Sequence, residues 1–475
     1  MRRQMGVRGC VRALFAILPL VLLASCGGGT GSSSTGSGPQ SASVYTVATD
    51  APLPSVISCQ ITVTGVTIHN SVTNTDESVF SGSQVIDFAQ LSGLHQLMDL
   101  NAVTPGTYTS ATVTISNPMI GFINVPGGGG EPTIQTVTGT LSMGSVMVTF
   151  ANPFVLANAD LVGLAMEFDL RQSLATDSNG NITGAVNPVF EMALLNSTNA
   201  SVSIDDFLVG YIGASGNGNF IVQGPHGRQW TVETNDNTMF DDSDVPMSSY
   251  TTSTILGITG SLDPVSKDIV ASEVQVVSNS GFYFGGLFTW INPATGPATS
   301  ADVYVRDELP SVNGISPGDI TTLPLTGSEV YKIGHINLPL TTLLFNNSAL
   351  AAGQRVGVGG TLDTSSGTPQ LTVSRVVLRR QGQRGTLAGN VVVNNGNNGS
   401  FQLTDNWTAG VLLPAPLTVL TTNDTVFINL SGLSALQGAA TTTPLRVVGF
   451  VIVDPGLSPA APVLVARSVE QLPAD

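Results

Sequence analysis

Charged residues are scarce in this chain of 475 residues: they make up 10% of it, and the only lysines are Lys267 and Lys332. With 16 basic against 32 acidic residues, the net charge is −16. Average soluble domains contain about 25% charged residues. A nucleic-acid-binding protein neutralises phosphates with clustered Lys and Arg, so the composition argues against nucleic acid as a partner. The 42% hydrophobic content argues against a chain that is disordered throughout.

The N-terminus has the pattern of a secretory signal. Four arginines lie between residues 2 and 12, and an apolar run follows over residues 13–23. This run is too short to cross a bilayer, which takes about 20 helical residues. Small residues then precede a cysteine in the sequence LASC at 23–26. We therefore expect a signal peptide over residues 1–25, which is removed from the mature chain.

The end of this signal resembles the lipobox of bacterial lipoproteins. The resemblance implies cleavage before Cys26, a diacylglyceryl thioether on Cys26, and acylation of the new amine by a fatty acid such as palmitate. Several acyl chains exceed the two signals that stable membrane anchoring requires. Gly27 stands where aspartate would retain a lipoprotein at the inner membrane, so we expect the outer membrane, on its periplasmic or extracellular face. The alternative is an ordinary secreted protein with a chance cysteine at this position.

A flexible tether is expected over residues 26–41, because this segment is rich in Gly and Ser and has nothing to bury. The cysteine count is consistent with this reading. Cys10 leaves with the signal and Cys26 is lipidated, so no disulfide can form within the mature chain. The remaining cysteine, Cys59, alternates in phase with apolar residues and is predicted to be a buried thiol.

The rest of the chain has the period of β-strands: short apolar–polar alternations separated by turn residues. In the segment 164–170, large apolar residues recur at every second position, so Glu167 and Asp169 between them are predicted to point away from the core. A one-residue shift of the apolar phase at Gly65 predicts a β-bulge. The segment QLSGLHQLMDL at 90–100 is predicted to contain a helical turn or two.

Several short motifs occur in a distinctive order between residues 42 and 196: TDAP, ITVTGVTIHN, LSGLHQLMDL, PGTY, EFDLRQS and NPVF. In this order they resemble the bacterial domain of unknown function 4382, which is common near the N-terminus of surface lipoproteins. The resemblance implies a β-sandwich over residues 42–196. That family has no established enzymatic activity, so the resemblance supplies no catalytic residue.

The second half of the chain contains three similar segments, marked by Gly260, Gly360 and Gly449 at spacings of 100 and 89 residues. Each consists of a strand, a turn and a second strand. Upstream, the sequence TND at 234–236 parallels TND at 422–424. Units of this length can each form a small domain. We therefore predict three modules, which are placed at residues 202–280, 281–382 and 383–475.

The repeats are similar to the domain of unknown function 5666, most clearly over residues 354–362. The middle repeat departs from that pattern by a long insertion near residues 306–349. Short strands with glycines are typical of small closed barrels. The predicted fold class is all-β, with an N-terminal β-sandwich followed by about three small OB-like β-barrel repeats.

The chemistry-bearing residues form no catalytic motif. The four histidines, at positions 69, 95, 226 and 335, have no metal-ligand spacing, and neither a G-x-S-x-G nor an S-x-x-K motif occurs. We therefore expect no catalytic residue, no cofactor and no metal site. One acidic loop leaves a question open, because its carboxylates could bind calcium or form ordinary solvated surface. Its residues are Asp241, Asp242 and Asp244.

These observations predict a lipid-anchored, non-catalytic protein of the cell envelope that acts as an adhesion, scaffold or binding module. Its expected partners are the membrane, through the lipid anchor, and an unidentified envelope protein or polysaccharide. One alternative is a carrier or sensor that holds a small ligand in a barrel mouth. A less favoured alternative is a hydrolase with a cryptic pair of acids, since two carboxylates need only meet in space.

Overall fold

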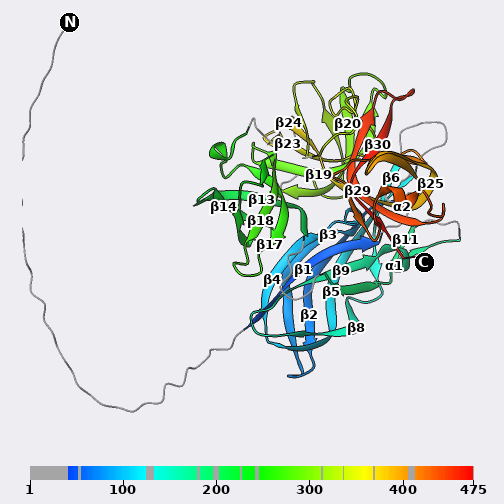
Figure 1. The fold of residues 1–475 in the computed structure, drawn as a ribbon. Coiled ribbons are helices and arrows are strands. Elements are labelled where there is room, and N and C mark those ends of the chain that lie inside the picture. The colour runs from blue at the N-terminus through cyan, green and yellow to red at the C-terminus, as the bar shows by residue number, and fades with distance from the viewer. Residues whose placement is uncertain are drawn as a thin grey trace, which may run out of the picture. The chain divides into compact units, whose positions relative to one another are not determined.

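The computed structural model describes residues 41–51, 55–124, 133–178, 182–195, 203–224, 227–240, 245–311, 314–334, 336–366, 370–404 and 412–473. Strands dominate this part of the chain, which confirms the all-β prediction (Figure 1). Its helical segments are single turns: η1 (Phe88–Gln90), α1 (Leu170–Ser173), η3 (Met247–Ser249) and α2 (Leu433–Leu436). The predicted signal peptide, the tether before residue 41 and the acidic loop lie outside the described residues.

The N-terminal module contains two main sheets, as expected for a β-sandwich. The first sheet has the order β12 (Phe190–Leu194), β9 (Leu161–Asp169), β1 (Ala42–Ala51) and β4 (Gln96–Val103). The second sheet has the order β3 (Thr75–Asp87), β2 (Val56–Asn70), β5 (Gly106–Asn124) and β6 (Thr133–Thr138), and β8 (Ser145–Leu156) also pairs with β5. A small third sheet contains β10 (Leu174–Thr176), β11 (Ile182–Val186) and β7 (Thr140–Leu141).

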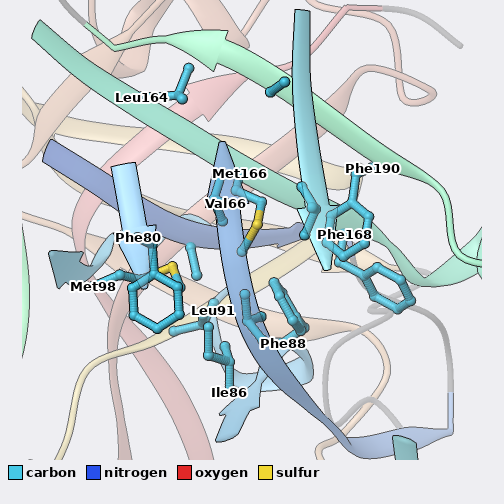
Figure 2. Packing of buried hydrophobic residues seen from close by; sticks show 14 of the residues in the cluster. Val66, Phe80, Ile86, Phe88, Leu91, Met98, Leu164, Met166, Phe168 and Phe190 are labelled. Carbon is cyan, nitrogen blue, oxygen red and sulfur yellow. The ribbon is translucent and has the colours of Figure 1, made fainter. Parts of the chain in front are cut away.

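Side chains from the facing sides of the two main sheets fill one core. Figure 2 shows Phe88, Phe168 and Phe190 close together in it, and their ring centroids lie 5.0–6.1 Å apart. Leu164 and Met166 are buried in the same cluster, which confirms the predicted alternation along β9. Each such side chain contributes about 1.5–3 kcal/mol through the removal of apolar surface from water.

Two local predictions had different outcomes. The bulge at Gly65 is confirmed, because the register of β2 shifts between Val63 and Gly65 against both neighbouring strands. The helical reading of residues 90–100 is wrong beyond its first residue, Gln90. Only η1 is helical there, and the residues from Gln96 onward form β4. Backbone pairing with β1 decides the outcome, since tertiary context overrides the weak helical preference of single residues.

The second half of the chain folds into three six-stranded sheets, coloured green, yellow-green and orange to red in Figure 1. Repeat 1 contains β13 (Ser203–Gly216), β14 (Asn219–Gln223), β15 (Gln229–Glu233), β16 (Met239–Phe240), β17 (Ile255–Leu262) and β18 (Ile269–Ser278). Repeat 2 contains β19 (Phe282–Asn292), β20 (Ser300–Leu309), β21 (Ile320–Pro324), β22 (Val330–Ile333), β23 (Arg355–Asp363) and β24 (Gln370–Leu378). Repeat 3 contains β25 (Gln381–Asn395), β26 (Asn398–Thr404), β27 (Leu417–Thr421), β28 (Val426–Ile428), β29 (Pro444–Asp454) and β30 (Ala461–Gln471).

All three sheets have the same strand order: third, second, first, fifth, sixth and fourth. In repeats 1 and 3 the third strand also pairs in parallel with the sixth, which closes a five-stranded barrel. A five-stranded barrel with this strand order and this closure is typical of an OB-fold. The prediction of OB-like repeats is therefore confirmed. In the described part of repeat 2, no such pairing joins β21 to β24, and the sheet stays open. The long insertion of this repeat corresponds to the extended connections after β20 and β22.

The three glycines that mark the repeats occupy equivalent positions. Gly260, Gly360 and Gly449 each lie at a register shift between the fifth and sixth strands of their sheet. A Cβ on any of them would lie 2.1–2.3 Å from a backbone carbonyl oxygen of the neighbouring strand. Only glycine allows this close approach of two strands at a bulge.

The structure shifts the predicted alignment of the TND motifs by one residue. In repeat 1, Thr238 Oγ1 accepts a hydrogen bond from Asn235 N (2.9 Å) and donates one to a carbonyl of the sixth strand. In repeat 3, Thr425 Oγ1 accepts from Thr422 N (2.9 Å) and donates to the equivalent carbonyl. Thr422 is therefore the structural counterpart of Asn235. The match of the two TND motifs had paired Thr422 with Thr234.

Cys59 is fully buried in the core of the sandwich, as predicted. A thiol reagent reaches such a group only when the module opens, because the core leaves no path to it. We expect slow labelling of Cys59 in the native protein and fast labelling in urea, followed by mass spectrometry of the modified peptide. Rapid labelling without denaturant would contradict the burial of this side chain.

Candidate functional site at the junction of the modules

Arginine has an unusual distribution in this protein. The chain has 14 arginines, which is 16 basic residues less the two lysines, and four of these precede residue 13. Five of the other ten are at most 8% exposed: Arg306, Arg355, Arg375, Arg379 and Arg380. Buried arginine is rare unless it is paired, so the contacts of these residues show what the protein uses them for.

Arg306, on β20 of repeat 2, reaches into the sandwich. Its Nη2 donates a hydrogen bond to the carbonyl of Ile57, and its Nε lies 3.5 Å from Oδ2 of Asp87. The other carboxylate oxygen of Asp87 accepts a hydrogen bond from Cys59 N (2.8 Å). Burial raises the pKa of the Asp87 carboxyl, and the guanidinium of Arg306 opposes that rise. The pair therefore joins repeat 2 to the sandwich by charge.

The connection after β24 and the first two residues of β25 contact several modules, and we call these residues, 379–382, the hub. Arg379 Nη1 donates to the hydroxyl of Tyr283 (3.2 Å) and lies over its ring, 5.6 Å from the centroid. Arg380 forms an ion pair with Glu273 of repeat 1 and donates to Thr259 Oγ1 (3.0 Å). Both partners of Arg380 lie far from it in sequence, so the hub fixes repeat 1 against the start of repeat 3.

The second half of the hub faces repeat 2 and the sandwich. The amide of Gln381 accepts from Arg355 N (2.8 Å) and donates to the carbonyl of Gly353 (3.0 Å). A Cβ on Gly382 would lie 1.6 Å from the backbone carbonyl oxygen of Ser92 in the sandwich. The first strand of repeat 3 therefore approaches the sandwich as closely as two backbones can.

Apolar contacts continue across the same boundaries. Tyr45, Val47 and Ala165, on the outer side of the first sheet, are buried in one cluster with Phe207 and Trp230 of repeat 1. Trp230 is thus a core residue. Repeats 2 and 3 also share a cluster, and Gln354 Nε2 donates to the carbonyl of Val451 across their boundary (3.0 Å).

The prediction that Glu167 and Asp169 point away from the sandwich core needs one correction. Glu167 lies on the outer side of the first sheet, but repeat 3 covers this side and the side chain is half-buried. Burial raises the pKa of the Glu167 carboxyl, and the guanidiniums of Arg446 and Arg384 oppose that rise. Asp169 caps α1, where its Oδ1 accepts from Gln172 N (2.9 Å).

A cavity of about 300 Å³ lies where the sandwich, repeat 1 and repeat 2 meet, and we call it the junction cavity. This volume is at the lower end of the range for small-molecule sites. The residues that line it are mainly polar or charged: Gln84, Asp87, Gln90, Gln96, Asp205, Arg306, Asp307, Glu308, Ser311, Arg355 and Arg379, with Val85, Leu91, Leu94, Phe207, Leu208 and Leu309.

Charge is distributed unevenly over this lining. The three arginines are 2–8% exposed, and Asp87, at 3%, is equally buried. Asp205, Asp307 and Glu308 are partly exposed. The cavity therefore has an inner wall with a net positive charge and an acidic rim. On the rim, Asp205 Oδ2 lies 3.3 Å from the ring Nδ1 of His95. Of the sequence's histidines that the structure describes, His95 is the one near the cavity.

The other residues singled out in the sequence lie elsewhere. His69 Nδ1 lies 2.8 Å from Asp76 Oδ1 at the end of β2. Cys26, His226 and His335 lie outside the described residues, and so does the acidic loop with its three aspartates. Within the described part of the chain, no three His, Cys, Asp or Glu side chains are placed to hold a metal. No helix found there is long and apolar enough to span a membrane.

Sequence reasoning missed the junction, although one signal was present. The sequence RRQGQR at 379–384 places three arginines within six residues in a chain that has few cations. It falls at the predicted boundary between repeats 2 and 3, where a polar linker would be the ordinary expectation. Concentrated charge in an otherwise uncharged linker could have indicated a buried contact.

Comparison with known proteins covers only the first module. No curated protein and no solved structure matches the chain. The family described as "Domain of unknown function (DUF4382)" matches residues 41–183, which ends before β12, the last strand of the sandwich. The resemblance predicted from the motifs of the N-terminal module is thus confirmed, and this module is similar to that family.

Proposed function

We propose that this protein is a lipid-anchored, non-catalytic component of the cell envelope whose four modules form one preassembled platform for binding. The observation that supports this most directly is the junction: modules that could have been joined by flexible linkers are instead held by buried charged contacts. An adhesion or scaffold protein gains affinity when its surfaces are fixed before the partner arrives.

The contacts of the junction favour lasting association of the modules. Apolar side chains of different modules share buried clusters, and exposing them to water on separation would cost free energy. The ion pairs Asp87–Arg306 and Arg380–Glu273 fix the arrangement, because removing one partner leaves the other charge buried and costs several kcal/mol.

The proposed location rests on the N-terminal sequence. A lipid on Cys26 and a Gly/Ser-rich tether would hold the platform at the outer membrane. The repeats, which resemble the domain of unknown function 5666, would then face an envelope protein or a polysaccharide.

Replacement of Cys26 by alanine tests the anchor. We expect the Cys26→Ala variant to stay unprocessed and unlipidated, whereas wild type gains the mass of its acyl chains and partitions with the membrane fraction. Cys10→Ala, which changes a cysteine inside the signal, is the matched control and should mature normally. A Cys26→Ala protein that is processed and fractionates with membranes as wild type does would refute the anchor.

The binding role is tested with the purified full chain and isolated cell envelopes. We expect saturable binding to envelopes and no turnover of glycoside, ester or peptide substrates. Binding should be lost when the modules are separated by the Arg306→Met substitution considered below. Turnover of any of these substrates, or binding that is indifferent to this substitution, would count against a preassembled platform.

A further inference from the structure

We propose that the junction cavity binds a small zwitterion of the α-amino-acid type, with its carboxylate toward the inner arginines and its ammonium toward the acidic rim. This inference goes beyond the platform function but rests on the assembled modules, because three of them line the cavity. It also differs from the ligand site expected in a barrel mouth, because the cavity lies between modules.

The first argument is charge. The inner wall carries Arg306, Arg355 and Arg379 against one carboxylate, that of Asp87. A simple anion would be attracted to this wall but would have to pass a rim of three carboxylates. A simple cation would be attracted to the rim and repelled by the wall. A ligand with both charges, separated by one or two atoms, fits both.

The second argument is a set of polar atoms without partners. Two side-chain oxygens of residues that line the cavity are closed to solvent and have no hydrogen-bond partner among the described residues: Gln84 Oε1 and Asp307 Oδ1. Asp87 Oδ2 and Arg306 Nε also lack a hydrogen bond, but they face each other in the ion pair, 3.5 Å apart. Gln84 is more than nine-tenths buried. Native proteins satisfy nearly all such groups, and each one left over needs an explanation.

The two free oxygens suit the proposed ligand. Both are acceptors, and an ammonium group carries three donors. The guanidiniums of the inner wall are donors from which a carboxylate accepts. The terminal torsions of Asp and Gln side chains are soft, so Asp307 and Gln84 can turn these oxygens toward a ligand at little cost.

The test is titration calorimetry of the full chain in detergent, with glycine, L-serine and L-glutamine as probes. Ethanolamine and 3-hydroxypropionate, which are serine without its carboxylate and without its ammonium, serve as matched half-ligands. We expect the protein to bind at least one of these amino acids. Its affinity for each half-ligand should be at least tenfold lower than its affinity for that amino acid. Asp307→Asn keeps the shape of the side chain and should weaken amino-acid binding about tenfold or more.

Asp76→Asn is the control, because it removes the same charge from an exposed site on the sandwich. Asp76→Asn should leave the affinity for the amino acid unchanged. If Asp307→Asn lowers the melting temperature of the protein, Glu308→Gln takes its place as the test variant. The proposal is overturned if none of the three amino acids binds. It is equally overturned if a half-ligand binds as well as its amino acid, or if the rim variants bind normally. None of these results would affect the anchor or the platform.

Discussion

Replacing Arg306 with methionine is expected to lower the free energy of unfolding by about 3–5 kcal/mol, the usual cost of removing one partner from a buried ion pair. Methionine preserves most of the volume of the side chain, so the loss reports on charge rather than on packing. The carboxylate of Asp87, which is 3% exposed, would remain in the interior without its cation. Urea denaturation followed by tryptophan fluorescence measures the change.

A second variant separates the ion pair from general damage. When Asp87→Asn is added to Arg306→Met, no buried charge is left unpaired, and more than 1 kcal/mol of the lost stability should return. Arg171→Met, on the exposed surface of α1, is the control and should have a small effect. If the double variant is as unstable as the sum of the two single variants, the Asp87–Arg306 pair does not hold the modules together.

Gly382→Ala is the second substitution with a large expected effect. The new Cβ would lie 1.6 Å from the carbonyl oxygen of Ser92, an atom of the backbone that no side-chain rotation can move. We expect a loss of about 3 kcal/mol or more, at the upper end of the range for overpacked sites. Repeat 3 should also become accessible to protease at the hub, because the clash pushes it away from the sandwich.

The matched control for this variant is Gly438→Ala. Gly438 is exposed, and a Cβ there would meet nothing within 4 Å. It adds the same methyl group to the same repeat and should change stability by less than about 0.5 kcal/mol. Equal effects of the two substitutions would show that the close approach at Gly382 does not exist in solution.

The local fold could be predicted from the sequence because its signals are local. Alternation predicted the strands, a phase shift predicted the bulge at Gly65, and the recurrence of Gly260, Gly360 and Gly449 predicted three repeats. Each signal depends on a period of two or on the steric freedom of glycine, both of which act over a few residues. The helical reading of residues 90–100 failed because pairing with a distant strand outweighs local preference.

The junction could not be predicted in the same way. Asp87 and Arg306 belong to different modules, and nothing in the sequence around either residue indicates the other. The same holds for Arg380 and Glu273, and for the cavity, whose lining comes from three modules. A single sequence shows which side chains carry charge, but pairing between modules depends on how whole domains pack.

Differential scanning calorimetry of the full chain tests the central claim most directly, namely that buried charges at the junction join the modules into one unit. We predict a single cooperative transition for wild type, with equal calorimetric and van't Hoff enthalpies. In Arg306→Met this transition should split, as the sandwich and the repeats begin to unfold separately. Several independent transitions in wild type, at temperatures that Arg306→Met leaves unchanged, would contradict a preassembled platform.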